Sequence, residues 1–483
     1  MPLDSKIKII IVGAGKAGEL IADEINQDQE SAFEIIGFVD DDIKKQGKTI
    51  TGFRVLGQVS DLRNMIVDTK ADEIFITIPS ERGRVIRDIV EQTAGLKIVY
   101  KILPRLSEVL MQDFDKGYLK FIRRVRAEDL LGGEILKSDQ DEIGKFAENQ
   151  VIMITGAAGS IGSELSRQIS AYGAKKVIFY DWWENGMFEL SNQLLEAYPK
   201  GNFEFIIGDI KDRKKLSLVV SVHKPSTIFH AAAYKHVPLM ESNPAEAIRN
   251  NIMGTKNVAE IAIKHKVQKF VLVSSDKAVN PTNIMGATKR AAEKMIHILS
   301  QSQNDTVFCA VRFGNVINSN GSVLPIFEKQ IEMGGPLKVT HKDITRFFMT
   351  IPEAVHLILQ SWIMGKNNDL FVLDMGESIK IYDLAKLLIT LQGYVPEIDI
   401  KINIIGLRPG EKLYEEVLVK EEETSSTSVK KIYRTQNYMR FDTLAFLNNY
   451  NLLIESIEDE GLNSEFLRSQ LQEMISTYKP ANH

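Results

Sequence analysis

Residues 151–162 read VIMITGAAGSIG, and this stretch decides the fold of the chain. The apolar run Val151–Thr155 predicts a buried strand, the glycines predict a tight turn, and the helical spacing of Leu165 and Ile169 predicts a helix after it. In such a unit the first glycine permits the turn, the second lets the backbone approach a pyrophosphate, and the third lets the helix pack closely. The stretch therefore predicts a nucleotide-binding unit, with backbone N–H groups and a positive helix end facing a diphosphate.

A second unit of the same kind lies near the N-terminus. Residues 8–18 read KIIIVGAGKAG and are followed by helical spacing, and Asp40–Asp42 follow the next apolar strand. After each glycine motif, short apolar strands alternate with amphipathic helices, which is typical of parallel sheets covered on both faces. We predict an α/β protein with two Rossmann-like, doubly wound parallel-sheet domains.

Turn residues and charged, weakly periodic stretches suggest how the chain divides into domains. We expect a first domain over residues 1–105, a linker with some helix over 106–149, a second domain over 150–420, and a mobile segment with a helical tail over 421–483. From Asn315 onward the second domain becomes irregular, which predicts a smaller substrate-binding subdomain. The first domain lacks a catalytic pair on its later strands. A structural or oligomerising role is therefore favoured there over a nucleotide sensor.

Composition excludes several classes of protein. The 483 residues include 59 Lys and Arg against 64 Asp and Glu, and the net charge of −5 argues against a nucleic-acid binder. No apolar stretch approaches the roughly 20 residues that span a bilayer, and no signal pattern opens the chain, so a cytoplasmic protein is expected. The single cysteine, Cys309, excludes an intrachain disulfide, and no His or Cys cluster has metal-ligand spacing.

The second unit carries further cofactor signals. Asp181 follows Gly156 by 25 residues at the end of a strand, where a carboxylate can accept hydrogen bonds from the adenosine ribose and repel a 2′-phosphate. NAD is therefore favoured over NADP. A carboxylate in Asp209-Ile210 can face the adenine, and three alanines after the following strand leave room for cofactor and sugar. The predicted cofactor residues are Gly156, Gly159, Ser160, Ile161, Gly162, Asp181, Asp209, Ile210, Ala231, Ala232 and Ala233.

Residues 271–290, VLVSSDKAVNPTNIMGATKR, join a strand to a helix through a polar turn and Pro281. Met285 and Lys289 lie four apart, on one face of that helix. The stretch resembles the extended short-chain dehydrogenase/reductase family, whose active helix bears a Tyr and a Lys at this spacing. Met285 stands at the Tyr position and removes the phenolate. The resemblance implies that Lys289 holds the nicotinamide ribose.

A narrower resemblance rests on four motifs: 233–241 (AYKHVPLME), 275–281 (SDKAVNP), 312–316 (RFGNV) and 321–323 (GSV). They resemble the bacterial polysaccharide-biosynthesis nucleotide-sugar dehydratases, and the Met-bearing branch comprises UDP-N-acetylglucosamine 4,6-dehydratases that retain the C5 configuration. The likeness covers about residues 128–416, and residues 8–104 resemble the domain that precedes the catalytic unit in long members. Those members usually begin with membrane helices, which this sequence lacks, so we expect a soluble relative or a chain without its membrane part.

The chemistry implied by this resemblance needs an acid and a base. Oxidation at C4 by NAD makes a ketone that acidifies the C5 proton, and water then leaves from C5 and C6 before the hydride returns to C6. The resemblance implies that Asp276 protonates the departing hydroxyl and Lys277 removes the C5 proton. Lys277 must then be neutral, and we expect burial beside cationic NAD and Lys289 to lower its pKa. Ser275 is our candidate relay for the C4 hydroxyl proton, on toward Asp276.

The same frame suggests contacts for UDP-N-acetylglucosamine or a related UDP-sugar. The loop after the cofactor strand holds two candidates, and others are expected to line the sugar or to neutralise the diphosphate. The alternative role of the basic residues is to form surface salt bridges. For Asp276 the alternative is a helix-capping carboxylate, and for Lys277 it is a solvated side chain. The predicted substrate residues are Lys235, His236, Asn315, Ser322, Arg346, Arg408 and Glu411.

Two other functions stay open on the sequence. A C5-inverting dehydratase or a 4-epimerase of a UDP-sugar would use the same frame, although an epimerase needs no acid at C6, so the Asp276-Lys277 pair argues against it. A catalytically silent NAD-binding regulator is conceivable because of Met285 and the duplicated nucleotide fold. In each case we expect a homo-oligomer.

Overall fold

The computed structural model describes residues 6–28, 30–78, 83–104, 117–131, 140–416, 418, 423–436, 441–458 and 464–481. The chain forms two compact units. The first comprises residues 1–134, 321–342 and 380–405, and the second comprises 135–320, 343–379 and 406–483. Two stretches of the irregular region that follows Asn315 therefore belong to the unit that begins at the N-terminus.

The sheet of the first unit has the strand order β3-β4-β2-β1-β5-β6-β7. Its inner strands are parallel, while β3 and β7 run antiparallel to their neighbours β4 and β6. The strands are β1 (Ile7–Val12), β2 (Phe33–Val39), β3 (Thr49–Ile50), β4 (Phe53–Gly57), β5 (Glu73–Ile76), β6 (Val99–Ile102) and β7 (Arg123–Arg124).

Helices and two further strands complete this unit. Ile21, Ala22 and Ile25 of α1 pack on the buried face of β1 and β2. The elements are α1 (Lys16–Gln27), η1 (Val59–Asp61), α2 (Leu62–Thr69), α3 (Arg84–Gln92), η3 (Leu119–Phe121), α5 (Ala127–Leu131), α14 (Val323–Glu332), α16 (Ile381–Leu391), β15 (Leu337–Val339) and β20 (Ile402–Ile404).

The larger sheet of the second unit has the order β10-β9-β8-β11-β12-β13-β18-β22-β21. From β10 to β18 every neighbouring pair is parallel. The strands are β8 (Val151–Thr155), β9 (Lys176–Asp181), β10 (Phe203–Ile207), β11 (Thr227–His230), β12 (Lys269–Val273), β13 (Val307–Arg312), β18 (Asp369–Leu373), β21 (Glu423–Ser426) and β22 (Ile432–Gln436); outside this sheet lie β14 (Asn315–Val316), β16 (Thr345–Arg346) and β17 (Phe348–Met349), and β19 (Ile379–Lys380) spans the division between the units.

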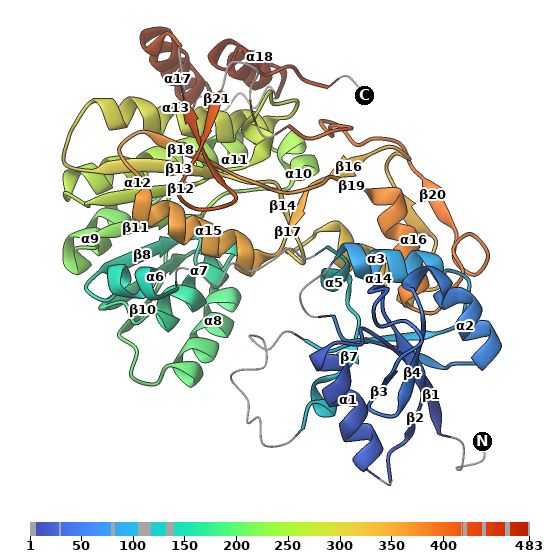
Figure 1. The fold of residues 1–483 in the computed structure, drawn as a ribbon. Coiled ribbons are helices and arrows are strands. Elements are labelled where there is room, and N and C mark those ends of the chain that lie inside the picture. Colours follow the sequence, from blue (N-terminus) through green and yellow to red (C-terminus); the bar gives the residue numbers. More distant parts are fainter. Residues whose placement is uncertain are drawn as a thin grey trace. The chain divides into compact units, whose positions relative to one another are not determined.

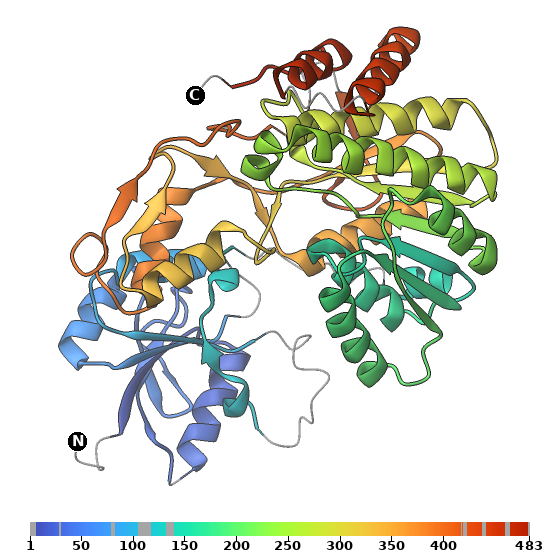
Figure 2. The same cartoon turned by 180° about the vertical axis from the view of Figure 1, so that it is seen from behind.

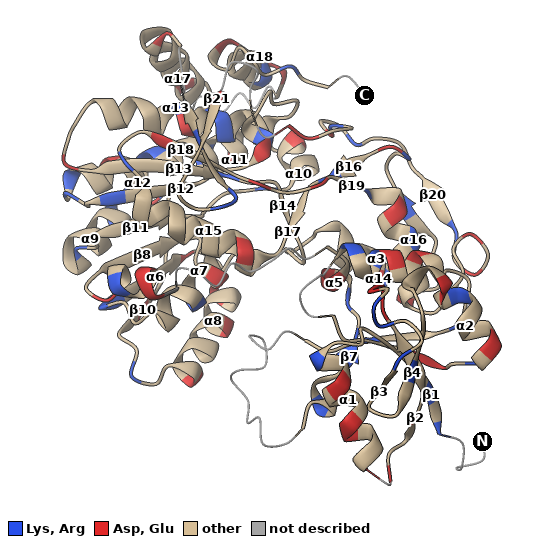
Figure 3. Cartoon of the chain, in the orientation of Figure 1, with Lys and Arg blue, Asp and Glu red and all other residues tan. Residues whose placement is uncertain are grey.

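Helices cover both faces of this sheet (Figure 1). One buried cluster joins α6, α7, α8 and α15 to the strands, and another joins α9, α12 and α13. Strands β8 and β11 carry no Lys, Arg, Asp or Glu and are tan throughout in Figure 3, as expected of strands buried on both faces. The helices are α6 (Gln140–Ala147), α7 (Ser160–Ala171), α8 (Glu184–Ala197), α9 (Arg213–His223), α10 (Val237–Ser242), α11 (Pro244–Ile248), η4 (Arg249–Gly254), α12 (Thr255–Lys264), η5 (Asp276–Ala278), α13 (Ile284–Gln301), α15 (Ile351–Met364), α17 (Thr443–Glu458) and α18 (Ser464–Met474).

The predicted fold class is confirmed: both units contain a Rossmann-like parallel sheet. In the second unit the strand order reverses between β8 and β11, the point at which doubly wound sheets bind ligands. The glycine turn after β8 and the alanine run after β11 therefore lie on the two sides of this switch point.

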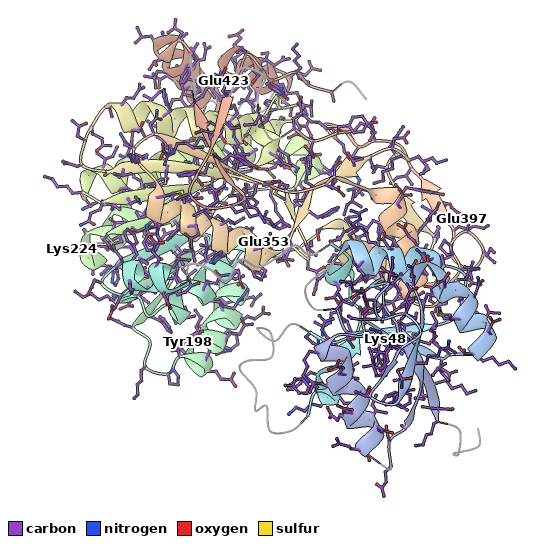
Figure 4. The ribbon with its side chains drawn as sticks, viewed as in Figure 1. Lys48, Tyr198, Lys224, Glu353, Glu397 and Glu423 are labelled. Atoms are coloured by element: carbon purple, nitrogen blue, oxygen red, sulfur yellow. The ribbon has the colours of Figure 1, made fainter. Side chains whose placement is uncertain are left out.

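Two stretches differ from the sequence expectation. Arg123–Arg124, inside the expected linker, adds strand β7 to the first sheet. Residues 423–436, where we expected a mobile segment, contain the antiparallel strands β21 and β22, which extend the second sheet. Ile432 is buried in the core. Lys431, in the turn between the two strands, pairs at 2.7 Å with Glu353 in the first turn of α15, and this pair anchors the hairpin. Glu353 is labelled in Figure 4.

The helical tail packs on helix α13. Figure 2 shows α17 and α18 beside α11 and α13, and one apolar cluster holds residues of all four helices. Beyond α18 the backbone N–H groups of Lys479 and Ala481 donate to the carbonyls of Pro281 and Thr282, at 2.9 and 3.1 Å. The C-terminal residues thus brace the loop that leads into α13.

A buried ion cluster joins α13 to the sheet. Glu293 accepts hydrogen bonds at 2.7 Å from two guanidinium nitrogens of Arg312 on β13 and at 2.6 Å from Ser274 after β12. Arg290 lies 3.1 Å from the same carboxylate. Burial opposes the ionisation of Glu293, but the two arginines outweigh it and hold its pKa at about 2. Helix α13 is therefore fixed to β12 and β13 by charge as well as by apolar packing.

Glu293→Gln should destabilise the second unit by about 3–5 kcal/mol at neutral pH, because it leaves the fully buried Arg312 without its counter-charge. Since the folded-state pKa of Glu293 is depressed, this stabilisation is complete above its ordinary value and declines as the pH falls toward about 2. Tryptophan fluorescence during urea unfolding measures the change, because all three tryptophans lie in the second unit.

Glu196→Gln, at an exposed position on α8, is the matched control and should change stability by less than about 0.5 kcal/mol. Equal stability of the two variants across the acid range would show that the cluster does not hold α13.

Candidate functional site

The turn between β8 and α7 packs closely on the chain that follows β11. Gly156 has φ of +71°, and a Cβ there would lie 2.6 Å from the backbone nitrogen of Ala232. A Cβ on Gly162 would overlap the carbonyl oxygen of Gly156. Only glycine fits either position, so the turn can stay tight and close to the chain after β11. Ser160 and Ile161 form the first turn of α7, as predicted.

Asp181 ends β9 beside this turn, where the sequence placed it. Its carboxylate accepts hydrogen bonds at 2.9 Å from the backbone nitrogens of Ala158 and Trp183. Burial raises its pKa in spite of these bonds. Asp209 lies at the end of the neighbouring β10, where its carboxylate contacts the backbone nitrogen and the ammonium of Lys211, and Ile210 is buried.

The first unit repeats the same arrangement. A Cβ on Gly18 would overlap the carbonyl oxygen of Gly13, and Asp40 accepts from the backbone nitrogens of Ala14 and Asp42 at 2.8 and 2.9 Å. Asp40 also pairs with Lys45 at 3.0 Å. Burial opposes ionisation here as well, but the hydrogen bonds and Lys45 lower the pKa of Asp40. Each unit therefore has a glycine turn between its first strand and first helix, which we call a glycine cradle, and an aspartate at the end of its second strand.

Asp276 lies directly after β12 in the short helix η5, and its side chain is fully buried. Its Oδ1 accepts a hydrogen bond from Ser275 Oγ at 2.9 Å. Its Oδ2 is buried and has no hydrogen-bond partner among the described residues. Burial raises the pKa of this carboxyl, with Lys277 opposing the shift and Glu415 adding to it. Ser275 caps η5, so Asp276 is not the helix-capping carboxylate of the alternative interpretation.

Lys277 is surrounded by oxygen atoms. Its Nζ lies 3.1 Å from Asp276 Oδ1, 3.0 Å from Asn315 Oδ1 and 3.4 Å from Glu415 Oε1. These acceptors match the three N–H groups of an ammonium. The side chain is 19% exposed, so it is not the solvated lysine of the alternative reading.

The expected lowering of the Lys277 pKa is wrong for this structure. Burial does lower it, but the negative charges of Asp276 and Glu415 outweigh burial, and the pKa is raised. Lys289, which we expected to repel Lys277, instead donates to the carbonyl of Val273 at 2.7 Å. Burial lowers the pKa of Lys289 itself to about 8.

Met285 and Lys289 lie one turn apart near the start of α13, as predicted. Asn283 caps the helix by accepting from the backbone nitrogen of Gly286 at 2.7 Å. Met285 is buried in the apolar cluster shared with α10, α11 and the tail helices. At the position of the family tyrosine the chain therefore places an apolar side chain with no proton to exchange.

The structure places the predicted substrate residues in different surroundings. Asn315 contacts Lys277, whereas Lys235 and His236 are exposed in the loop after β11. Loss of surrounding water and then the charge of Lys277 lower the pKa of Lys235. Ser322 is the N-cap of α14 and belongs to the first unit, so its predicted place beside the sugar stays a prediction.

The arginine expected to meet a diphosphate has carboxylate partners within the protein. Arg346 on β16 lies 3.4 Å from both Glu411 and Glu415. The sequence left open a surface salt bridge, but the pair of Arg346 with Glu415 is largely buried. Arg408 is exposed, and its backbone nitrogen donates to Glu411 at 3.1 Å. A diphosphate contact by Arg346 would need exchange of these carboxylates.

Sequence reasoning missed two residues that shape this site. Glu415 faces Lys277 from a loop more than a hundred residues away, and no pattern at Lys277 points to it. Asn251 in η4 holds the loop after β11 by two hydrogen bonds with the backbone of Tyr234 and donates to Thr288 on α13. A lone Asn inside a helix is a weak signal, and only the position of Glu415 after Arg408-Pro409-Gly410 hints at a functional loop.

Comparison with protein families gives two matches. Residues 152–437 match the model of a family described as "Polysaccharide biosynthesis protein". Residues 4–104 match a model described as "CoA-binding domain". In the part of the chain that the structure describes, no helix is both long and apolar enough to traverse a bilayer.

Two curated relatives are 44% identical to this chain. Over 431 residues it is similar to the capsular polysaccharide biosynthesis protein CapD of Staphylococcus aureus, covering 88% of this chain and 71% of the relative. Over 472 residues it is similar to the probable polysaccharide biosynthesis protein EpsC of Bacillus subtilis, covering 97% and 77%.

Solved structures share the fold over part of this chain. Pen from Bacillus thuringiensis is 33% identical, with a TM-score of 0.56 over 62% of this chain and 90% of its own. The dTDP-glucose 4,6-dehydratase DesIV of Streptomyces venezuelae is 19% identical, with a TM-score of 0.50 over 56% and 88%, and that likeness shows the fold alone.

Gly162→Ala should weaken NAD binding about 5- to 150-fold, because an added Cβ forces α7 away from the Gly156 carbonyl at a cost of about 1–3 kcal/mol. Calorimetric titration with NAD measures the change. Gly144→Ala in α6 is the matched control, since its Cβ would meet only Tyr172 at 3.9 Å, and it should bind like the wild type. Equal affinity of both variants would remove this turn from the cofactor site.

Proposed function

Since the chain belongs to the polysaccharide biosynthesis protein family, we propose that it is an NAD-dependent UDP-N-acetylglucosamine 4,6-dehydratase. Its product would be a UDP-4-keto-6-deoxy-N-acetylhexosamine for surface polysaccharide. The observation that carries the proposal is the buried Asp276-Lys277 pair beside Ser275, at the end of a strand next to the switch point. It offers an acid, an amine and a proton path in one place.

The residues of the second unit fit a dinucleotide. A Cβ at Gly156 or Gly162 would collide with neighbouring backbone, so only glycine keeps this turn tight; with Asp181 at the end of the second strand, these residues would hold the diphosphate and the adenosine ribose. Lys289 would hold the nicotinamide ribose. When bound, NAD supplies the acceptor and donor for the hydride that leaves C4 and returns to C6.

Asp276 is suited to be the acid at C6. Its raised pKa favours the protonated carboxyl at higher pH than in an ordinary aspartate, and its buried Oδ2 has no hydrogen-bond partner among the described residues. Ser275 can take the C4 hydroxyl proton while its own proton passes to Oδ1 of Asp276. Asp276 must be ionised when it takes this proton at Oδ1; as a neutral carboxylic acid it then protonates the departing C6 hydroxyl, so the proton lost from the C4 hydroxyl leaves in water.

Lys277 is the proposed base at C5. In the structure it is an ammonium held by three oxygen atoms, so it must lose a proton before it can remove another. After elimination it carries the C5 proton and can return it to the same carbon when the hydride reaches C6. Return to the face from which the proton left retains the C5 configuration, which accords with Met285 at the tyrosine position.

Sugar contacts are proposed for the groups near Lys277. Asn315 holds Lys277 and would face the sugar ring, and Lys235 and His236 would approach from the loop after β11. Arg408, which is exposed, and Arg346 would meet the diphosphate, with Glu411 orienting both.

Incubation with UDP-N-acetylglucosamine tests the function through the mass of the product. A dehydratase removes one water, an epimerase yields an isomer of unchanged mass, and a silent NAD-binding regulator leaves the substrate as it was. Reaction in deuterated water followed by analysis of C5 then reports whether its configuration is retained or inverted.

Asp276→Asn should lower the rate of water loss at least about 100-fold, because an amide cannot protonate the departing hydroxyl. NAD affinity should be unchanged, which separates loss of the acid from loss of the fold. Asp305→Asn, on the surface with 61% of the side chain exposed, is the control and should react like the wild type. Undiminished water loss in Asp276→Asn would exclude Asp276 as the acid.

A further inference from the structure

The loop over residues 406–416 brings a carboxylate against Lys277. Glu415 is only 4% exposed, and its Oε1 lies 3.4 Å from Lys277 Nζ and 3.4 Å from Arg346 Nε. Its Oε2 is buried without a hydrogen-bond partner among the described residues. A buried carboxylate is costly unless it is paired, so this one is retained by the two cations it faces.

The loop is anchored on the catalytic segment itself. The carbonyl of Gly410 accepts hydrogen bonds at 3.0 Å from both Thr282 and Asn283, and Lys412 donates to the carbonyl of Val279 at 2.8 Å. These bonds join the loop to the turn that follows Lys277. The distance between Glu415 and Lys277 is therefore set by neighbouring backbone rather than by the flexible side chains alone.

The charges that face Lys277 come from four elements. Asp276 in η5 and Glu415 in the loop are negative, whereas Arg346 on β16 and Lys235 after β11 are positive. Asp276 changes its own protonation as the proposed acid, so its charge varies during the reaction. Glu415 has its pKa lowered by Lys277, Arg346 and Lys412 against the effect of burial, and it therefore stays negative.

We propose that Glu415 is a positioning residue that holds the Lys277 ammonium in place and sets the pH at which this amine can act as a base. The second part rests on the proposed function, in which Lys277 removes the C5 proton. A constant negative charge beside Lys277 keeps its amine protonated when the Asp276 charge is lost. It thereby lets the lysine retain the C5 proton until the hydride has returned.

Glu415→Gln removes the charge but keeps an oxygen that can accept from Lys277. Loss of an opposite charge at this distance shifts a pKa by about 1 unit or more, so the neutral fraction of Lys277 should rise about tenfold at a pH below its midpoint. Acetylation by acetic anhydride measures this fraction, because only the neutral amine reacts. Peptide mass spectrometry gives the rate at Lys277 relative to Lys16, which is 81% exposed.

We expect Lys277 to be acetylated about tenfold faster in Glu415→Gln than in the wild type. Glu416→Gln is the matched control: its carboxylate is the next in the chain, is 52% exposed and pairs with Lys412 instead. It should leave the rate unchanged, and Glu415→Asp, which keeps the charge, should return the rate toward the wild type. An equal rate in the wild type and Glu415→Gln would overturn the proposal.

Dehydration assays give a second and separate result. The half-maximal point on the acid side of the pH profile of kcat/KM should move to lower pH in Glu415→Gln. A uniform loss of activity without this movement, together with unchanged acetylation, would assign Glu415 a structural role only. Acetylation needs no substrate, so a wild type that fails to dehydrate UDP-N-acetylglucosamine would refute the proposed function without changing the result for Glu415.

Discussion

One ammonium group joins three parts of the second unit that lie far apart in the chain. Lys277 Nζ is within reach of Asp276 on the same turn, Asn315 after β13 and Glu415 in a late loop. Three acceptors for three N–H groups satisfy the charge where little water reaches it. Because a buried charge tolerates little displacement from its partners, this contact fixes the turn after β12, the chain after β13 and the loop together.

Beneath that site the protein holds charges of a different kind. Glu293 is buried and pairs with Arg290 and Arg312, and these ion pairs tie α13 to β12 and β13. Around Lys277, by contrast, one oxygen of Asp276 and one of Glu415 are buried without partners among the described residues. Paired charges stabilise the framework, whereas the oxygens without partners mark the place where a ligand can supply the missing hydrogen bonds.

The two glycine cradles show how similar geometry can carry different charges. Asp40 and Asp181 make the same pair of backbone hydrogen bonds, yet Asp40 also has Lys45 and its pKa is lowered, while that of Asp181 is raised by burial. The Asp276-Lys277 pair lies beside the second glycine cradle. In the first unit the later part of the chain adds α14, α16, β15 and β20 to the nucleotide-type sheet.

Local patterns in the sequence predicted what depends on neighbours along the chain. The glycine turn, the strand before it, the aspartate at the end of β9 and the Asp276-Lys277 pair all follow from residues within about one supersecondary unit. The hairpin at residues 423–436 did not, since its polar strands are held by the edge of a sheet formed elsewhere. Local patterns also did not predict strand β7 at Arg123–Arg124, inside the expected linker, because this strand is held by the edge strand β6.

The sequence by itself therefore determined the two parallel-sheet folds, the glycine turn after β8 and the adjacent Asp276 and Lys277 after β12, because spacing and residue type decide these locally. Only the tertiary structure decided the charge of Lys277, the partners of Arg346 and the presence of Glu415. Electrostatic interactions depend on distance in space, and the loop that carries Glu415 meets Lys277 only after β12, β13 and α13 have packed.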